Sequence, residues 1–248
     1  MSPEFFFYVA AGFTAQLIDG ALGMAYGVTA SSLLLSVGVP PAITSATVHA
    51  AECFATGASA VAHHAFGNVD RTLFRRLLVP GVVGAIVGAY VLSNFPGATL
   101  TPFVSGYLIV MGGVIIVKAF RMFPPRAVVT HLVPLAFGGA LVDALGGGGW
   151  GPIVATTLIA RGGDVRRTIG SVNAVEFFVT LAASMTFVLM LGLTNWRMII
   201  GLALGGLVAA PIAAWACTRV PRRPFMILVG LLVIGLSIRT FVRYYHLF

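Results

Sequence analysis

Four of the seven acidic residues lie inside apolar stretches long enough to cross a bilayer, and they form two pairs with the same spacing. Asp19 and Glu52 are 33 residues apart, as are Asp143 and Glu176, and a shift of 124 residues places one pair on the other. A carboxylate in hydrocarbon is costly unless it is paired, hydrogen-bonded, protonated or facing a water-filled cavity. Intramembrane acids at equivalent points of a repeat are typical of transporters whose site lies between two halves.

Each glutamate follows a polar residue by three positions, with His49 before Glu52 and Asn173 before Glu176. Residues three apart share one face of a helix, so each pair points in one direction. Burial favours the uncharged form of a carboxyl group, and such a group can take up a proton on one side of a membrane and release it on the other. We therefore predict that both glutamates carry coupled protons, with His49 as a relay partner of Glu52. The alternative is a neutral glutamic acid that donates a hydrogen bond to a neighbouring hairpin.

Each aspartate precedes a glycine-rich segment, DGALGMAYG at 19–27 and DALGGGGWG at 143–151. Glycine destabilises a helix by about 1 kcal/mol relative to alanine, so we predict that both helices are broken here. A broken helix leaves N–H groups without partners at the positive end of its dipole, which is tolerated in a membrane only towards protein or a cavity. Two such tips that meet in mid-membrane would bind an anion without a buried arginine. The alternative is that the glycines only allow the chain to turn.

The predicted site combines the two breaks with polar side chains of the helices that follow them. The predicted substrate-binding residues are Gly20, Gly23, Gly27, Gly147, Gly148, Gly151, Thr47, Ser171 and Asn173. The predicted proton-coupling residues are Asp19, His49, Glu52, Asp143 and Glu176. Two structural alternatives remain open: the aspartates could accept hydrogen bonds from amides of the following turn, and the hydroxyls could bond to their own helices. The sequence contains no metal-ligand cluster and no nucleophile motif, so we expect a transporter without cofactor or metal rather than an enzyme.

Composition places these residues in a membrane. Hydrophobic residues make up 58% of the chain and charged residues 9%, whereas a soluble domain carries about 25% charged residues. The aromatic residues do not alternate with polar ones as in a membrane barrel, so the spans are predicted to be helical. The net charge of +8 does not indicate nucleic-acid binding, because nearly all basic residues lie in short connectors, which is the pattern that orients membrane proteins.

Eight apolar segments are predicted, and two of them, 5–37 and 127–160, are too long for one crossing. Since both contain a glycine-rich break, each is predicted to form a hairpin that turns inside the membrane, with arms of about 14 residues. The other segments are single spans: 42–66, 77–93, 101–118, 168–191, 197–216 and 224–245. We therefore predict an all-α integral membrane protein with one domain, 1–248, built from repeat 1 (1–122) and repeat 2 (123–248). Each repeat is a glycine-broken helical hairpin plus three transmembrane helices.

The basic residues predict that the two repeats have opposite orientations. The connector at 67–76 contains three arginines, whereas its counterpart near 192–197 contains one. The connector at 94–101 has no basic residue, whereas its counterpart before 224 has three. By the positive-inside rule, the repeats are inverted, and twelve of the fifteen Lys and Arg residues face the cytoplasm. Arg239 and Arg243, near a C-terminus on the other side, do not fit this rule.

Four stretches together resemble the TauE/SafE sulfite exporter family: DGALGMAYG at 19–27, GVPP at 38–41, the Ala/Thr/Ser-rich helix after it, and GNVD at 67–70. The resemblance covers essentially the whole chain, including the duplicated halves. It implies a multi-pass protein of the bacterial inner membrane that moves sulfite, sulfoacetate or other organosulfonates, mostly outward, and it assigns no residue roles. The second tip departs from the first, with four glycines at 146–149, so the two hairpins need not contribute equally.

We therefore predict a secondary transporter that exports a small sulfur oxyanion, sulfite or an organosulfonate such as sulfoacetate, by alternating access with coupled protons. One alternative is a passive anion channel that uses the same tips. Another is an importer of a different small anion, or of a metal cation, for which clustered Cys, His or Met ligands are lacking. The expected partners are the anion, protons and the lipid bilayer, without nucleic acid. A homo-oligomer is compatible with the sequence, which defines neither oligomeric state, direction nor stoichiometry.

Overall fold

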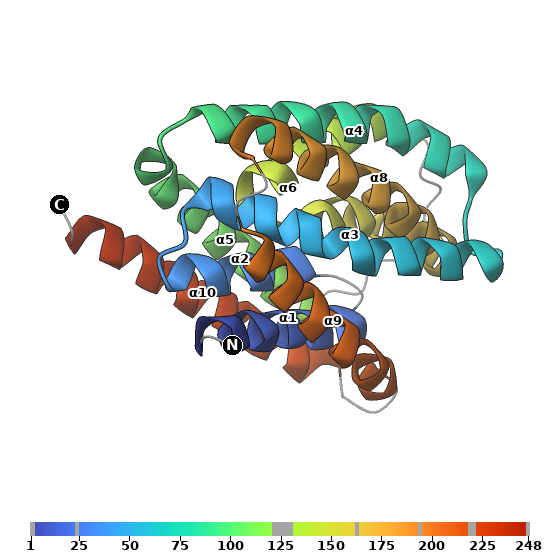
Figure 1. Cartoon of the computed structure of the whole chain (residues 1–248). Coiled ribbons are helices and arrows are strands. Elements are labelled where there is room, and N and C mark those ends of the chain that lie inside the picture. Colours follow the sequence, from blue (N-terminus) through green and yellow to red (C-terminus); the bar gives the residue numbers. More distant parts are fainter. Residues whose placement is uncertain are drawn as a thin grey trace.

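The computed structural model describes residues 3–22, 25–120, 131–161, 164–192, 195–217 and 222–246, and the secondary structure of this part is entirely helical (Figure 1). The helices in chain order are α1 (Pro3–Leu22), α2 (Tyr26–Ser36), α3 (Pro41–Ala65), α4 (Arg71–Asn94), α5 (Gly97–Phe120), α6 (Leu132–Gly146), the π-helical turn η1 (Gly151–Ala155), α7 (Thr156–Ala160), α8 (Val165–Leu191), α9 (Trp196–Cys217) and α10 (Arg222–His246). The predicted all-α class is therefore confirmed.

Both long apolar segments are broken where the glycines predict. Between α1 and α2, Ala25 has a φ of 102°, and between α6 and η1, Gly147 and Gly148 have φ values of 69° and 153°. Glycine adopts positive φ at little cost, so the glycine run supplies the second break directly. The expected arms of about 14 residues are wrong for the first hairpin, since α1 has 20 residues and α2 has 11. The helix continues past Asp19, because an aspartate does not by itself end a helix.

The two arms of the first hairpin end on the same side of the molecule. Glu4, at the start of α1, and the connector at 37–40 after α2 line one pocket. We call this side the N-terminal face. From there α3, with 25 residues and a length of about 37 Å, crosses to the opposite side, where Arg71, Arg75 and Arg76 are exposed. We call that side the arginine-rich face; Figure 1 has the N-terminal face on the left, together with both termini.

The centre of the molecule is the crossing of α3 and α8, which run in opposite directions (Figure 1). The hydrogen-bonded pairs follow this order along the two helices: Cys53 contacts Ser184, Thr56 contacts Thr180, and Ser59 contacts Asn173. Thr56 and Thr180 are 124 residues apart, the offset of the sequence repeat, and their hydroxyl oxygens are 3.5 Å apart. Equivalent helices of the two repeats therefore cross at equivalent residues.

Outer helices of each half also pack on a helix of the other half. α1 packs on α9, and α6 packs on α4. Glycines allow both contacts: a methyl group on Gly205 would collide with the backbone of α1 next to Phe13, and one on Gly84 would collide with the carbonyl of Phe137. Phe13 and Phe137 are again equivalent at the offset of 124. Close approach through small residues is the usual packing of helices in membranes.

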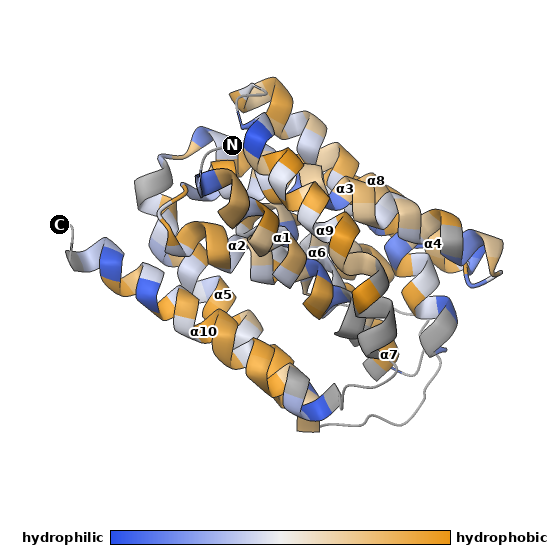
Figure 2. Ribbon diagram, turned by 60° about the horizontal axis from the view of Figure 1, so that its bottom comes forward, coloured by the Kyte–Doolittle hydropathy of each residue, from blue (hydrophilic) through white to orange (hydrophobic). Residues whose placement is uncertain are grey.

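The outer surface is suited to lipid. Four described helices are long and apolar enough to cross a membrane, over Arg71–Asn94, Thr99–Phe120, Arg167–Leu191 and Met226–Tyr245. Many large apolar side chains are exposed along the helices, and several of the strongly hydrophilic residues lie near helix ends (Figure 2). In contrast, α3 buries several hydroxyl groups as well as His49 and Glu52 at the centre. The protein is thus a multi-pass helical bundle whose polar residues face inward.

Candidate functional site

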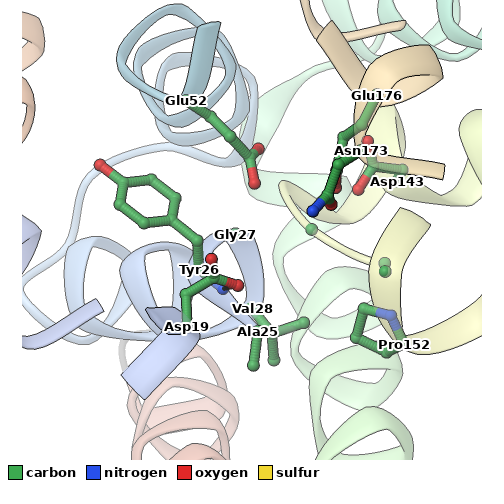
Figure 3. A pocket seen from close by; sticks show the side chains of 13 residues that line it. Asp19, Ala25, Tyr26, Gly27, Val28, Glu52, Asp143, Pro152, Asn173 and Glu176 are labelled. Carbon is green, nitrogen blue, oxygen red and sulfur yellow. Dashed lines mark hydrogen bonds between the residues drawn. The ribbon is translucent and has the colours of Figure 1, made fainter. Parts of the chain in front are cut away.

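A small cavity lies where the two helix breaks meet the middle of α3 and α8. All four intramembrane acids singled out by their spacing line it: Asp19 from α1, Glu52 from α3, Asp143 from α6 and Glu176 from α8 (Figure 3). The space open to the centre of a water molecule is about 20 Å³, which is near the minimum that one water needs. The fold thus gathers residues from four helices and both repeats around one enclosed polar point.

The two breaks touch each other at this point. A methyl group on Gly27 would lie 2.6 Å from the Cα of Gly148, and Gly148 has equally little room against Val28. Together with Gly149 and Gly151 they form the wall of the cavity opposite the glutamates. The N-terminus of α2 begins here, and the first turn of a helix has N–H groups without helical partners. Two glycine-rich tips therefore meet inside the membrane region, as the sequence analysis proposed.

The two aspartates make the same backbone contact in the two halves. Asp19 Oδ1 accepts a hydrogen bond from the amide of Tyr26 at 3.2 Å, and Asp143 Oδ1 accepts one from the amide of Trp150 at 2.9 Å. Both contacts span seven residues, and their members are equivalent at the offset of 124. Each carboxyl group thus bridges its own helix break and holds the following helix in place, which is the structural role considered for these residues.

Asp143 additionally binds His49, which comes from the other repeat. The distance from His49 Nε2 to Asp143 Oδ2 is 3.0 Å, and His49 Nδ1 lies 2.8 Å from the carbonyl oxygen of Ser45. A carbonyl only accepts, so Nδ1 carries a hydrogen. Nε2 then either donates from an imidazolium to an ionised carboxylate, or accepts from a protonated carboxyl group. In both arrangements His49 and Asp143 share one further proton and are neutral as a pair.

The partner of His49 thus differs from the expected one. The sequence spacing predicts a pairing with Glu52 three residues along α3, but the ring hydrogen-bonds across to α6 instead. The cause is local: the bond from Nδ1 to the carbonyl of Ser45, one turn earlier in α3, directs Nε2 away from the glutamate. The equivalent of His49 in the second repeat is Asn173, whose side-chain amide donates to Ser59 at 3.2 Å. The two halves therefore differ beside their aspartates.

Three hydroxyl groups of the first repeat hold the second break. Ser45 donates to the carbonyl of Ala144 at 2.6 Å, Tyr107 donates to that of Gly148 at 2.6 Å, and Ser31 donates to that of Gly147. Lys118, near the end of α5, donates to the carbonyl of Pro152, another residue of the cavity wall. The carbonyl groups of this tip are thereby turned towards protein donors. The sequence analysis missed Ser31, Tyr107 and Lys118; a polar side chain in an otherwise apolar span is the signal that could have identified Tyr107.

The glutamates are the groups left available inside the cavity. Within the described part of the chain, neither carboxyl group has a side-chain or backbone donor. Glu52 is only 7% exposed, and its carboxyl group points into the cavity from α3 (Figure 3). Behind the two glutamates, Thr56 and Thr180 donate to the backbone carbonyls of Glu52 and Glu176, each at 2.9 Å. The two acids therefore face the same enclosed space, and each has a threonine hydrogen-bonded to its backbone carbonyl.

The remaining predicted site residues are distributed unevenly. Gly27, Gly148, Gly151 and Asn173 line the cavity, and Gly147 lies next to it against Ser31 and Ser45. Thr47 and Ser171 do not line it: Thr47 is buried in α3, and Ser171 binds the backbone of Asp70 near the arginine-rich face. Gly20 lies in α1, and Gly23 is outside the described residues.

The chemistry of the cavity is that of protons and small polar ions. Its ionisable lining consists of carboxyl groups and Tyr26, and the described residues contain no group of three or more His, Cys, Asp and Glu side chains arranged to hold a metal ion. An anion can enter a ring of four carboxyl groups only if several of them are protonated, since like charges at such short range repel strongly. Protonated carboxyl groups would also donate hydrogen bonds to it.

Comparison with known proteins agrees with this description. The sequence model of the family described as "Sulfite exporter TauE/SafE" matches residues 8–240. The chain is 40% identical over 242 residues to a protein of Bacillus subtilis (strain 168) described as "Probable membrane transporter protein YtnM", covering 94% of this chain and 81% of that protein. No solved structure matches the chain.

Proposed function

The chain belongs to the sulfite exporter TauE/SafE family and is a transmembrane transporter, and from that premise we propose that it exports sulfite or a small organosulfonate by alternating access, with coupled protons. The observation that carries the proposal is the convergence of two helix breaks and four carboxyl groups on one enclosed cavity. The breaks offer amide donors to anionic oxygens, and the acids offer exchangeable protons. A family that moves sulfur oxyanions fits both features.

The two halves are part of the proposal: we take them to be inverted repeats. α3 and α8 are equivalent at the offset of 124 and pack in opposite directions, with Thr56 against Thr180. Two equivalent antiparallel helices that cross at equivalent residues are related by a two-fold axis perpendicular to both. Such an axis lies in the membrane plane, which is the symmetry that lets one fold adopt two mirror-related conformations. The arginines gathered on one face support a cytoplasmic position for that face, and we propose the bacterial inner membrane as the location.

Proton coupling follows from electrostatics at the cavity. Ionised Glu52 and Glu176 repel an anion, whereas their protonated forms donate hydrogen bonds to its oxygens. The anion and the proton therefore favour each other's binding and cross together. If a divalent anion leaves with one proton, the complex carries one negative charge, and a membrane potential that is negative inside favours its exit by about 2.3 kcal/mol per 100 mV. Export by a proton-linked carrier is thus consistent with the usual sign of the bacterial membrane potential.

The test is sulfite and sulfoacetate flux in liposomes with Glu52→Gln, Glu176→Gln and the double variant. Glutamine keeps the shape and the hydrogen-bonding capacity of a protonated glutamic acid but cannot release a proton. We expect the variants to fold and to lose the acceleration of flux by a pH gradient. Asp164→Asn is the matched control, since it removes a charge from the exposed start of α8 and keeps a capping oxygen there.

Full stimulation by a pH gradient in the double variant would refute the coupling role of the glutamates. Flux that ignores the gradient in the unmodified protein, at a rate far above that of carriers, would instead favour a passive anion channel. Wild-type protein that moves neither anion under any gradient would refute the proposed substrate class.

A further inference from the structure

We infer that Ser171 and Asp70 form a closed gate on the arginine-rich face, and that Thr47 and Asn195 are the two sides of an equivalent gate on the N-terminal face, which is open in this conformation. The inference rests on the alternating access of the proposed function and assigns its gates. It also gives Thr47 and Ser171, which lie away from the cavity, a role other than binding substrate.

The contact on the arginine-rich face is tight. The hydroxyl of Ser171 accepts a hydrogen bond from the amide of Asp70 at 2.8 Å and lies 3.4 Å from the carbonyl oxygen of the same residue. One residue earlier, a methyl group on Gly170 would collide with the backbone of Asn68. The connector before α4 is therefore packed directly against the backbone of α8. Because the Asp70 side chain also caps α4 by accepting from Thr72 and Leu73, this connector and the start of α4 form one unit.

The repeat identifies the matching elements on the other face. Thr47 lies 124 residues before Ser171, and Asn195 immediately precedes α9 just as Asp70 immediately precedes α4. The backbone carbonyl of Asn195 accepts from Met198 and Ile199 in the first turn of α9, so this connector also belongs to its helix. If the halves are inverted repeats, the counterpart of the contact between Ser171 and Asp70 is a contact between Thr47 and Asn195.

That counterpart contact is not made in this structure. The hydroxyl of Thr47 is buried and has no hydrogen-bond partner within the described part of the chain. A buried hydroxyl without a hydrogen-bond partner costs free energy. A conformation in which Thr47 gains such a partner therefore recovers that cost. Ser171, its counterpart, is fully buried and has both a donor and an acceptor within reach.

A pocket occupies the place where the second gate would close. Its volume is about 570 Å³, and its walls include Pro40 and Ile43 at the start of α3 and Asn195 and Met198 at the start of α9. Ile43 and Thr47 are four residues apart and therefore lie on the same face of α3, with Thr47 one turn closer to Glu52. The elements that are joined on the arginine-rich face are thus separated by a pocket on the N-terminal face. The pocket has the volume of a small-molecule site.

This arrangement describes one half of a transport cycle. The pocket forms the open entrance on the N-terminal face, while the packed connector closes the arginine-rich face. In the other half, the connector before α4 releases Ser171, and Asn195 moves with the start of α9 onto α3 and gives the Thr47 hydroxyl a hydrogen-bond partner. One hydrogen-bonded contact is exchanged for its symmetry equivalent, so the two conformations have similar energies, as a reversible carrier requires.

The test uses two cysteine pairs in a background in which both native cysteines are replaced by serine. Asp70→Cys with Ser171→Cys locks the first gate, and Thr47→Cys with Asn195→Cys locks the second. Both pairs are locked as disulfides by mild oxidation, because thiols in contact need no reagent to reach them, and flux is measured with sulfoacetate, because sulfite cleaves disulfides. Each pair is repeated in a variant that also carries Ile43→Cys, and after the disulfide has formed a membrane-impermeant fluorescent maleimide reports whether the remaining thiol in the pocket is accessible. The corresponding single-cysteine variants are the controls.

We expect the first pair to cross-link in the resting protein, to abolish flux, and to leave the thiol at position 43 reactive. We expect the second pair to cross-link more slowly, to abolish flux, and to shield position 43. Continued flux after the first lock, or failure of the second pair to cross-link in vesicles that transport normally before treatment, would overturn the gate assignment. Cross-linking and labelling need no substrate, so the gates can fail while sulfite flux persists, and the proposed substrate can fail while both locks behave as expected.

Discussion

The contact between the two helix breaks can be tested with one methyl group. In Gly27→Ala, the new Cβ would lie 2.6 Å from the Cα of Gly148 and 2.9 Å from the carbonyl oxygen of Gly147, whereas ordinary contacts begin at 3.4 Å. The two tips must therefore separate by roughly 1 Å, and overpacking of this kind costs about 1–3 kcal/mol. Neither side can yield by rotating a side chain, because both neighbouring atoms belong to the backbone.

The matched control is Gly138→Ala. Gly138 lies in α6, one of the arms that leads to the second break, and a methyl group there meets nothing within 4 Å. Alanine in place of glycine within a helix is favourable by about 0.5–1 kcal/mol, so this variant should be at least as stable as the unmodified protein. The same Gly→Ala change is thus expected to lower stability at position 27 and to keep or raise it at position 138.

The assay has two readouts, thermal unfolding in detergent and sulfite flux in liposomes. For a chain of this length, 1 kcal/mol corresponds to about 2–4 °C in the midpoint, so Gly27→Ala should unfold several degrees below the control. Flux should fall with it, since a shift of 1 Å at a binding site weakens every directed contact made there. If Gly27→Ala matches Gly138→Ala in both readouts, the tips do not meet and the assignment of the cavity is wrong.

Two further predictions concern charge. Asp143→Asn should lower stability and flux more than Asp19→Asn, because Asp143 holds both the Trp150 amide and His49. Hydrogen bonds to charged groups contribute about 1.5–3 kcal/mol. Equal effects of the two variants on melting and on the pH profile of flux would contradict this prediction. Sulfite efflux should accelerate when a potassium gradient with valinomycin makes the liposome interior negative. For one net charge, the driving force changes by about 2.3 kcal/mol per 100 mV, or roughly fortyfold in the equilibrium distribution. Efflux that does not respond to the potential would show that the transported complex is neutral.

The sequence predicts the helices and the breaks well, because both depend on local properties. Long apolar runs define the spans, and the glycines at 146–149 can hardly continue a helix, so the second break was located to within a few residues. The repeat offset also predicts a relationship between distant residues, since it pairs Asp19 with Asp143 before any contact is known. The four acids that this offset relates all line the cavity, as expected if the two halves are the inverted repeats proposed above.

The contacts between the repeats could not be read from the sequence in the same way. The rotation of each helix about its axis decides whether a hydroxyl faces the cavity or a neighbouring connector, and hydrophobic periodicity is weak in a chain that is apolar on nearly all sides. Ser171 was expected at the substrate and instead binds Asp70. His49 was expected beside Glu52 and instead binds Asp143. In each case a hydrogen bond to the backbone fixes the side chain, and such bonds depend on tertiary packing.

The two halves share a fold but not the same proton chemistry, and this difference bears on how a symmetric carrier achieves direction. The two aspartates each accept a hydrogen bond from the amide seven residues later, and the backbone carbonyls of the two glutamates each accept one from a threonine. Within the described part of the chain, Asp143 hydrogen-bonds to His49, whereas the counterpart of His49 is Asn173, whose amide does not titrate in the physiological range. The second break is thus hydrogen-bonded to an imidazole of the other half, whereas among the described residues no imidazole contacts Asp19 at the first break. In the cycle proposed above, the repeated backbone would provide the two gates, and the replacement of His49 by Asn173 at the equivalent position would make the two sides chemically different.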